Sequence, residues 1–173
     1  MTLADFTSPG LMVPHLRGRD AASVIQELSQ AMQREKRVPD SLPFYQAALN
    51  REFLLSSDQE AGMAFPHARW PGLKDLIFAF GRSDEPLRWG AKAVCSVRLV
   101  FLLAVPATDS TQYLSVVAGL ARLAKNPPLL QSLQAVPGEA RMFEVFQQVE
   151  LRNNSLCNLE AASPQPPPRL ILP

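Results

Sequence analysis

The chain has 173 residues, of which 47% are hydrophobic and 19% charged, so the composition excludes a disordered or fibrous protein. Seventeen Lys and Arg against sixteen Asp and Glu leave a formal net charge of +1. Such a balance creates no broad field to attract nucleic acid or an anionic membrane surface. Because no apolar run approaches the roughly eighteen residues of a membrane-spanning helix, we expect a soluble, cytoplasmic protein with no membrane insertion.

Proline placement indicates where the folded part of the chain ends. Five of the 16 prolines fall between Pro164 and Pro173, where they favour an extended polyproline geometry outside any core. We therefore predict one folded domain over residues 1–152 and a Pro-rich, disordered tail over 153–173. The only cysteines, Cys95 and Cys157, are too few for a disulfide scaffold.

Two helices are predicted near the N-terminus. Apolar residues recur at helical spacing from Val24 to Met32, and Asp20 stands upstream as an N-cap, which predicts a helix over about 20–34. After Pro39, either Asp40 or Ser41 can cap a second helix that runs to about residue 53.

Strand-like segments follow in the middle of the chain. Residues 76–80 and 97–105 are rich in β-branched or aromatic residues, and the second run is nearly all apolar, as in a central strand covered on both faces. A shorter extended piece over 63–65 ends at Pro66.

The C-terminal third is predicted to be helical. One helix begins after a cap at Asp109 or Ser110 and continues to about residue 124, and Asn126 followed by two prolines begins a short helix. A last helix starts near Pro137. Strands that are apolar on both faces need helices on each face, so this order predicts an α/β fold with a mixed β-sheet flanked by helices on both faces.

The common catalytic motifs are missing from the sequence. No phosphate-binding loop ending in Gly-Lys-Ser/Thr, no Gly-x-Gly-x-x-Gly and no Gly-x-Ser-x-Gly is found, which argues against nucleotide and serine hydrolysis. The two histidines, His15 and His67, have no Cys, Asp or Glu at metal-ligand spacing, so we expect neither a metal nor a cofactor.

His67 has the most unusual local setting, because it follows Pro66 at the end of a short predicted strand. A neutral imidazole has a free ring nitrogen that can attack a phosphoryl group. Arg69 lies two residues on and Arg51 ends the second helix, so either guanidinium could hold phosphate oxygens if the fold brings it near. The residues alone leave it equally open that His67 fills this position for packing.

Two consecutive segments resemble a known family. Arg51-Glu52-Phe53-Leu54-Leu55-Ser56-Ser57 and Gly62-Met63-Ala64-Phe65-Pro66-His67-Ala68-Arg69 are similar to the Arg-Glu, Ser-Thr and Gly-x-Ala-x-Pro-His pattern of the fructose/mannitol-type EIIA domains of the bacterial phosphoenolpyruvate-dependent sugar phosphotransferase system (PTS). That family includes nitrogen-related regulatory EIIA proteins. The resemblance covers roughly residues 10 to 150.

The resemblance implies a phosphocarrier with the predicted fold. His67 would accept phosphate from the phosphocarrier protein HPr, or its nitrogen-branch relative, and pass it to an EIIB partner. Arg51 would match the arginine beside the active histidine, and Ser57 would replace the usual threonine with its hydroxyl retained. We expect Arg51, Ser57 and Arg69 to surround the phosphate.

This chain departs from the family pattern at two places. Asp58 and Glu60 stand where the family has a small, glycine-containing turn, and like charge there would oppose phosphorylation. Tyr113 stands where the family often has a second histidine; it can donate a hydrogen bond but does not carry protons near neutral pH. These departures keep open an alternative: an EIIA-like regulatory module that docks to a transporter, kinase or antiporter without obligatory phosphate transfer.

A docking patch and the second histidine complete the expectations. Met63, Phe65 and Trp70 are candidates for the rim of an apolar patch around His67. His15 matches no motif and is expected in a solvated loop.

Overall fold

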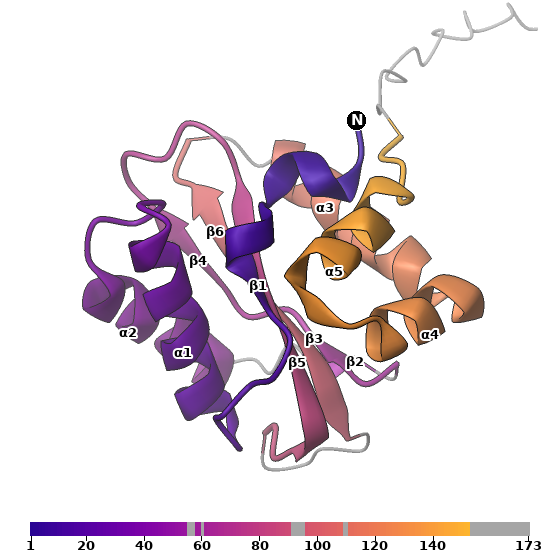
Figure 1. Cartoon of the computed structure of the whole chain (residues 1–173). Helices are drawn as coiled ribbons and strands as arrows, with labels where there is room; N and C mark the ends of the chain where they lie inside the picture. The colour runs from indigo at the N-terminus through magenta and orange to yellow at the C-terminus, as the bar shows by residue number, and fades with distance from the viewer. Residues whose placement is uncertain (55–57, 60, 91–95, 109–110, 153–173) are drawn as a thin grey trace, which may run out of the picture.

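The computed structural model describes residues 1–54, 58–59, 61–90, 96–108 and 111–152 (Figure 1). Several predicted features lie outside the described residues: Ser57, Glu60, Cys95, the candidate caps Asp109 and Ser110, and the Pro-rich tail over 153–173 with Cys157. The side chain of Asp58 is likewise not described.

The helices agree with the sequence prediction. The main ones are α1 (Ala21–Arg34), α2 (Ser41–Leu54), α3 (Thr111–Ala124), α4 (Pro127–Ala135) and α5 (Gly138–Gln147). The predicted caps of α1 and α4 are confirmed, because Asp20 accepts a hydrogen bond from the Ser23 backbone N–H and Asn126 accepts one from that of Leu129. Two short 3-10 helices precede them, η1 (Leu3–Phe6) and η2 (Pro9–Leu11).

Within the described residues, six strands form one mixed sheet in the order β1-β5-β6-β3-β2, with β4 also paired to β6. Their bounds are β1 (Met12–Val13), β2 (Asp58–Gln59), β3 (Met63–Ala64), β4 (His67–Trp70), β5 (Ile77–Leu87) and β6 (Val97–Pro106). The two long strands β5 and β6 are antiparallel, whereas β3 and β4 both run parallel to β6. The predicted mixed sheet is thus confirmed.

Helices cover both faces of this sheet (Figure 1). Alternate residues of a strand point to opposite faces, so Phe78 and Phe101 join one core with α3, α4 and α5, while Ala79 and Leu102 join a second core with α1 and α2. Both cores are closed to solvent at their centres, which explains why β5 and β6 are apolar on both sides.

The strands differ from the prediction in three respects. β5 extends to Leu87, beyond the apolar run, because its later residues still pair with β6 across an irregularity between Arg82 and Leu87. The two-residue strands β1 and β2 are too short to show period-two alternation in the sequence. The third is β4, which carries His67 and is described with the site.

None of the helices in the described part of the chain is both long and apolar enough to cross a membrane.

Candidate functional site

His67 is the first residue of a strand, not a residue beyond a strand's end. Ala64 is in register with Val100, and His67 with Leu103, so the chain keeps one alignment along β6 on both sides of Pro66. The Pro66 carbonyl still accepts a hydrogen bond of 2.9 Å from the Leu103 N–H. A proline is tolerated here because, among the described residues, no strand on the outer side of β6 pairs with Pro66 and requires its missing N–H.

The side chains of β4 point alternately to the two faces of the sheet, and His67 lies on the face away from α2, the helix that carries Arg51. Ala68 and Trp70 pack with the core beneath α1 and α2, so His67 and Arg69 point to the opposite side, toward α3. Because β4 lies at the edge of the sheet, Arg51 of α2 reaches His67 around that edge. The site therefore combines side chains from both layers of helices.

Arg51 makes the closest side-chain contact to the histidine. Its Nε donates a hydrogen bond of 2.5 Å to His67 Nε2. Arg51 is exposed and His67 half-buried, and both line a cavity of about 370 Å³ together with Arg69 and Tyr113. The end of α2 therefore lies close to the strand that carries His67, which is the arrangement that the sequence analysis required for a guanidinium group beside this histidine.

The hydrogen bonds of the two ring nitrogens define the tautomer of His67. His67 Nδ1 lies 3.1 Å from the carbonyl oxygen of Phe65, which can only accept, so Nδ1 carries the proton and donates it. Nε2 accepts from Arg51 and so holds a lone pair. Consequently Nε2, the nitrogen that faces the cavity, is the nucleophilic one.

The surroundings lower the pKa of His67 below the ordinary value of a histidine, 6.5. Burial is the main cause, because it disfavours the imidazolium, and the charges of Arg51 and Arg69 act in the same direction. The hydrogen bond to Phe65 and the charge of Glu52 oppose the decrease. His67 is therefore held in its neutral form at neutral pH.

Tyr113 lies near the same ring nitrogen of His67 that Arg51 contacts. It comes from the first turn of α3, and its hydroxyl is 3.4 Å from His67 Nε2. The two rings are tilted by 40° with centroids 5.2 Å apart. A phosphoryl group on Nε2 would meet this hydroxyl, which can donate to one of its oxygens.

Arg69 lines the same cavity but has a backbone partner. Its Nη1 donates a hydrogen bond of 3.2 Å to the carbonyl of Ala107, just after β6. Residues i and i+2 of a strand share a face, so Arg69 contributes positive charge on the side of His67. Of the predicted phosphate-binding side chains, Arg51 and Arg69 are thus near His67, and Ser57 lies outside the described residues.

Glu52 supports the site in a way that the sequence did not indicate. It is only 9% exposed, and its Oε1 accepts a 2.7 Å hydrogen bond from the indole Nε1 of Trp89, which is completely buried. A hydrogen bond to a charged group is worth about 1.5–3 kcal/mol. This bond fixes the last turn of α2, and hence Arg51, against the sheet; its only sequence signal was the Arg-Glu pair.

The expected docking patch is partly wrong. Met63 is completely buried in the core beneath α3, so it cannot form a rim. Trp70 is partly buried, with its ring edge-on to Phe44 at 5.8 Å. Met63 lies in the short strand that the sequence predicted, but the face to which its side chain points was not assigned. Trp70 lies in β4, which was not predicted because the strand was expected to stop at Pro66.

The geometry supports one kind of chemistry best. A neutral imidazole nitrogen that faces a cavity, with two guanidinium groups and a phenol beside it, can attack an electrophilic phosphorus and hold the resulting anion. Among the described residues, no cluster of three His, Cys, Asp or Glu side chains could hold a metal ion.

Comparison with known sequences identifies the same family. The model of the family described as phosphoenolpyruvate-dependent sugar phosphotransferase system, EIIA 2, matches residues 6–149. A nitrogen regulatory protein of Bradyrhizobium diazoefficiens is 28% identical over 146 residues, which are 84% of this chain and 95% of that protein.

Solved structures of similar fold belong to the same group. Nitrogen regulatory protein IIA-Ntr from Neisseria meningitidis matches with a TM-score of 0.70 at 23% identity, over 83% of this chain and 98% of that one. The IIA mannitol enzyme of Escherichia coli, in its complex with phosphorylated IIB, matches with a TM-score of 0.67 at 15% identity, over 81% of this chain and 96% of that one. At these identities the similarity shows the fold.

Proposed function

Because the chain belongs to the EIIA 2 family of the phosphoenolpyruvate-dependent sugar phosphotransferase system and so has a phosphocarrier or regulatory role, we propose that His67 is its phosphorylation site. The protein accepts phosphate from HPr or a nitrogen-branch relative and passes it to an EIIB partner. The observation that carries this proposal is the hydrogen bond of 2.5 Å from Arg51 Nε to His67 Nε2, on an imidazole whose other nitrogen is occupied by Phe65.

The transfer step leaves unchanged the number of protons on the His67 ring and on the histidine ring of the phosphate donor. The lone pair of His67 Nε2 attacks the phosphorus of the donor's phosphohistidine, a new N–P bond forms, and the donor's N–P bond breaks with its electron pair returning to the donor ring. The Nδ1 proton stays on its hydrogen bond to Phe65, where it stabilises the positive charge that the ring gains. In the transfer to EIIB, a cysteine thiolate or a histidine nitrogen of EIIB forms the new bond to phosphorus, and the His67 N–P bond breaks with its electron pair returning to Nε2.

The cations have a different task before and after transfer. Before it, Arg51 occupies the Nε2 lone pair, so its guanidinium must turn away for attack; afterwards its fork can bind two phosphate oxygens. Arg69 adds a second positive charge, and the Tyr113 hydroxyl supplies a further donor. By the family resemblance Ser57 would supply another hydroxyl.

Two similarities support the EIIB partner and the regulatory alternative respectively. The mannitol IIA structure of similar fold was solved in complex with phosphorylated IIB, which supports transfer to such a partner. The relative from Bradyrhizobium, matched over 95% of its length, is a nitrogen regulatory protein. It favours the alternative in which this chain docks to a regulated transporter, kinase or antiporter.

Incubation with phosphoenolpyruvate, the first PTS enzyme and HPr, followed by intact mass measurement, tests the proposal. An acid-labile gain of one phosphate that is absent in His67→Ala supports the carrier. The matched control is His15→Ala, which should still be labelled. No gain under conditions that label a known EIIA would overturn phosphate acceptance and leave the docking module.

A further inference from the structure

A second cavity, of about 510 Å³, lies where α1 ends and the loop between β4 and β5 passes over it. Its wall also includes η1 and Gln112 of α3, and it shares no residue with the cavity at His67. Its volume is within the range of sites that bind small molecules, which is about 300–1,000 Å³. Neither the family resemblance nor the proposed phosphate transfer assigns it a role.

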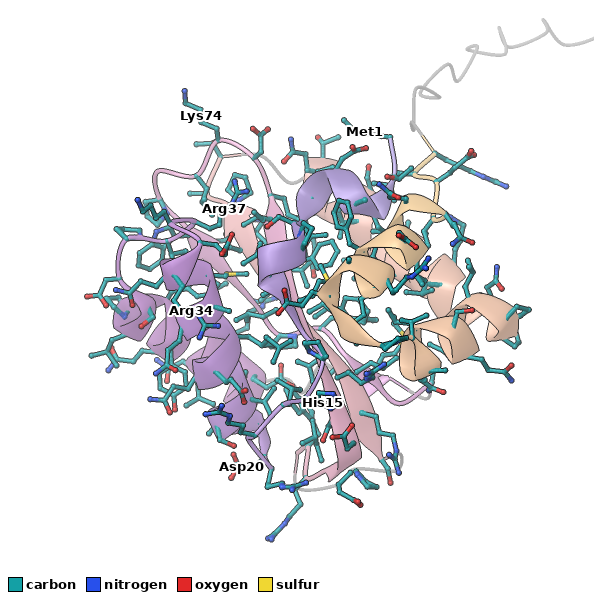
Figure 2. The ribbon with its side chains drawn as sticks, viewed as in Figure 1. Met1, His15, Asp20, Arg34, Arg37 and Lys74 are labelled. Carbon is teal, nitrogen blue, oxygen red and sulfur yellow. The ribbon has the colours of Figure 1, made fainter. Side chains whose placement is uncertain are left out.

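Three exposed cations surround this cavity: Lys36 and Arg37 after α1, and Lys74 before β5. Figure 2 shows Arg37 and Lys74 at the same end of the molecule. Within the described ranges, ion pairs join only His15 to Asp84 and Arg141 to Glu144, so none of the three cations has a carboxylate partner there.

The two carboxylates that line the same cavity each accept a hydrogen bond from a neighbouring residue. Asp5 accepts a 2.7 Å hydrogen bond from the backbone N–H of Thr2, and Asp75 accepts one of 2.9 Å from the side-chain amide of Gln112. Their charges reduce the positive field of the cavity without pairing with its cations. Three lysine and arginine charges against two aspartate charges leave the lining side chains with an excess of one positive charge.

Lys36 keeps its position in spite of an unfavourable backbone conformation. Its φ of 56° is in the left-handed region, where it ends α1 in the turn that usually contains glycine. The turn is complete, since Lys36 N–H donates to Gln33 and Arg37 N–H donates to Met32. A residue with a Cβ lowers stability at such a position. Glycine would avoid this cost but would not provide the positive charge of the lysine side chain.

The floor of the cavity is apolar. Phe6, Leu76 and Ile77 line it with at most 8% of each residue exposed. A ligand that fits must therefore combine a strongly anionic group for the rim with an apolar body for the floor. A phosphate group suits three cations that line one cavity, because it carries close to two negative charges and three acceptor oxygens.

We propose that this cavity binds a phosphorylated small metabolite with an apolar ring, its phosphate held by Lys36, Arg37 and Lys74 and its ring placed against Phe6 and Leu76. The site is a binding site only, with no bond made or broken. Because it is separate from His67, binding there is measurable on the unphosphorylated protein, whatever the outcome for phosphate transfer.

Calorimetric titration of the full chain with ADP tests this proposal, with adenosine and inorganic pyrophosphate as partial probes. We expect ADP to bind, pyrophosphate to bind more weakly, and adenosine to show no measurable binding. Raising the salt concentration should weaken ADP binding, because exposed charges are screened. Absence of ADP binding at low salt, or equal binding of adenosine, would overturn the site.

Lys36→Gly separates binding from stability, because the two should change in opposite directions. Because Lys36 is exposed, removing this cation should weaken ADP binding about 2–5-fold, as expected for one solvent-exposed ion pair. Glycine relieves the left-handed backbone, so the melting temperature should rise by about 2–4 °C. Lys125→Ala, an exposed lysine after α3 that does not line this cavity, should leave ADP affinity unchanged. Unchanged affinity in Lys36→Gly and Lys74→Ala would refute the proposal.

Discussion

The two histidines of this chain have opposite surroundings. His15 is 69% exposed at the side chain, and its Nδ1 lies 2.9 Å from a carboxylate oxygen of Asp84. His67 is half-buried at the edge of the sheet with Arg51 and Arg69 nearby and Tyr113 against its ring. Figure 2 shows His15 well away from the end of the molecule that carries Lys74.

The difference shows what makes a histidine suitable for phosphate. A carboxylate beside an imidazole repels an incoming dianion, whereas guanidinium groups attract it and keep the ring neutral. The nucleophilic nitrogen is therefore selected by its neighbours, since the two side chains are chemically identical. Each prediction below changes one of these neighbours or the ring itself.

The largest expected effect comes from removing the ring. His67→Gln should abolish phosphate acceptance from HPr, because no other described histidine has cations around a free ring nitrogen. His15→Gln should accept phosphate at the rate of the unmodified protein. Labelling of His67→Gln at a normal rate would show that another residue is the acceptor.

Arg51→Ala should slow phosphate acceptance by about 10²-fold, the usual loss when a preorganised donor to a developing anion is removed. Arg51→Lys restores the charge without the planar fork and should recover only part of the rate. Single-turnover transfer from phosphorylated HPr measures both. The control is Arg34→Ala, which changes an exposed arginine at the end of α1. Equal rates in Arg51→Ala and the control would remove Arg51 from the site.

A smaller effect is expected at the phenol. Tyr113→Phe keeps the ring contact with His67 and removes the hydroxyl at 3.4 Å, so acceptance should slow about 3–10-fold, in line with the loss of one neutral hydrogen bond. The lifetime of the phosphorylated form, followed by mass spectrometry, should shorten as well. A loss as large as that of Arg51→Ala would mean that the hydroxyl positions the His67 ring and does more than donate one hydrogen bond.

The smallest effect concerns stability and pH. The folded-state pKa of His67 is lowered, so the unfolded chain binds more protons as the pH falls below the unfolded value of 6.5. The protein should therefore lose stability as pH decreases through and below that value, until the folded-state pKa is passed. Urea midpoints of the unmodified protein should fall more than those of His67→Gln between about pH 7.5 and pH 5.5. Parallel curves would contradict the lowered pKa.

Much of the fold could be predicted because its signals are local. The cap at Asp20, the helical spacing from Val24 to Met32 and the Asn126 cap each lie within one element, and all agree with the structure. The doubly apolar strand β6 also indicated that helices cover both faces. β1 and β2 were missed because two residues carry no periodic pattern.

The sequence predicted which residues form the candidate site, but it did not predict how they are arranged. The motif singled out His67, Arg51, Arg69 and Tyr113, but Tyr113 is 46 residues from His67 along the chain and Arg51 is 16 away. Pro66 suggested a strand end because its missing N–H stops most strands, whereas here the strand resumes on the outer side of β6. The buried bond between Glu52 and Trp89 joins residues that are 37 apart in the chain, and the Arg-Glu pair gave no sign of the partner.

The sequence by itself determined which elements form and which side chains are able to carry phosphate chemistry, since capping, periodicity and residue type act over a few neighbouring residues. Only the tertiary structure decided that the lone pair of His67 is on Nε2, that Arg51 reaches it from the opposite helix layer, and that Met63 is buried. These outcomes depend on the register of β3 and β4 along β6 and on the packing of α2 and α3 against the sheet. Register and packing join residues far apart in the chain, and a shift of one residue would turn every side chain of β4 to the other face.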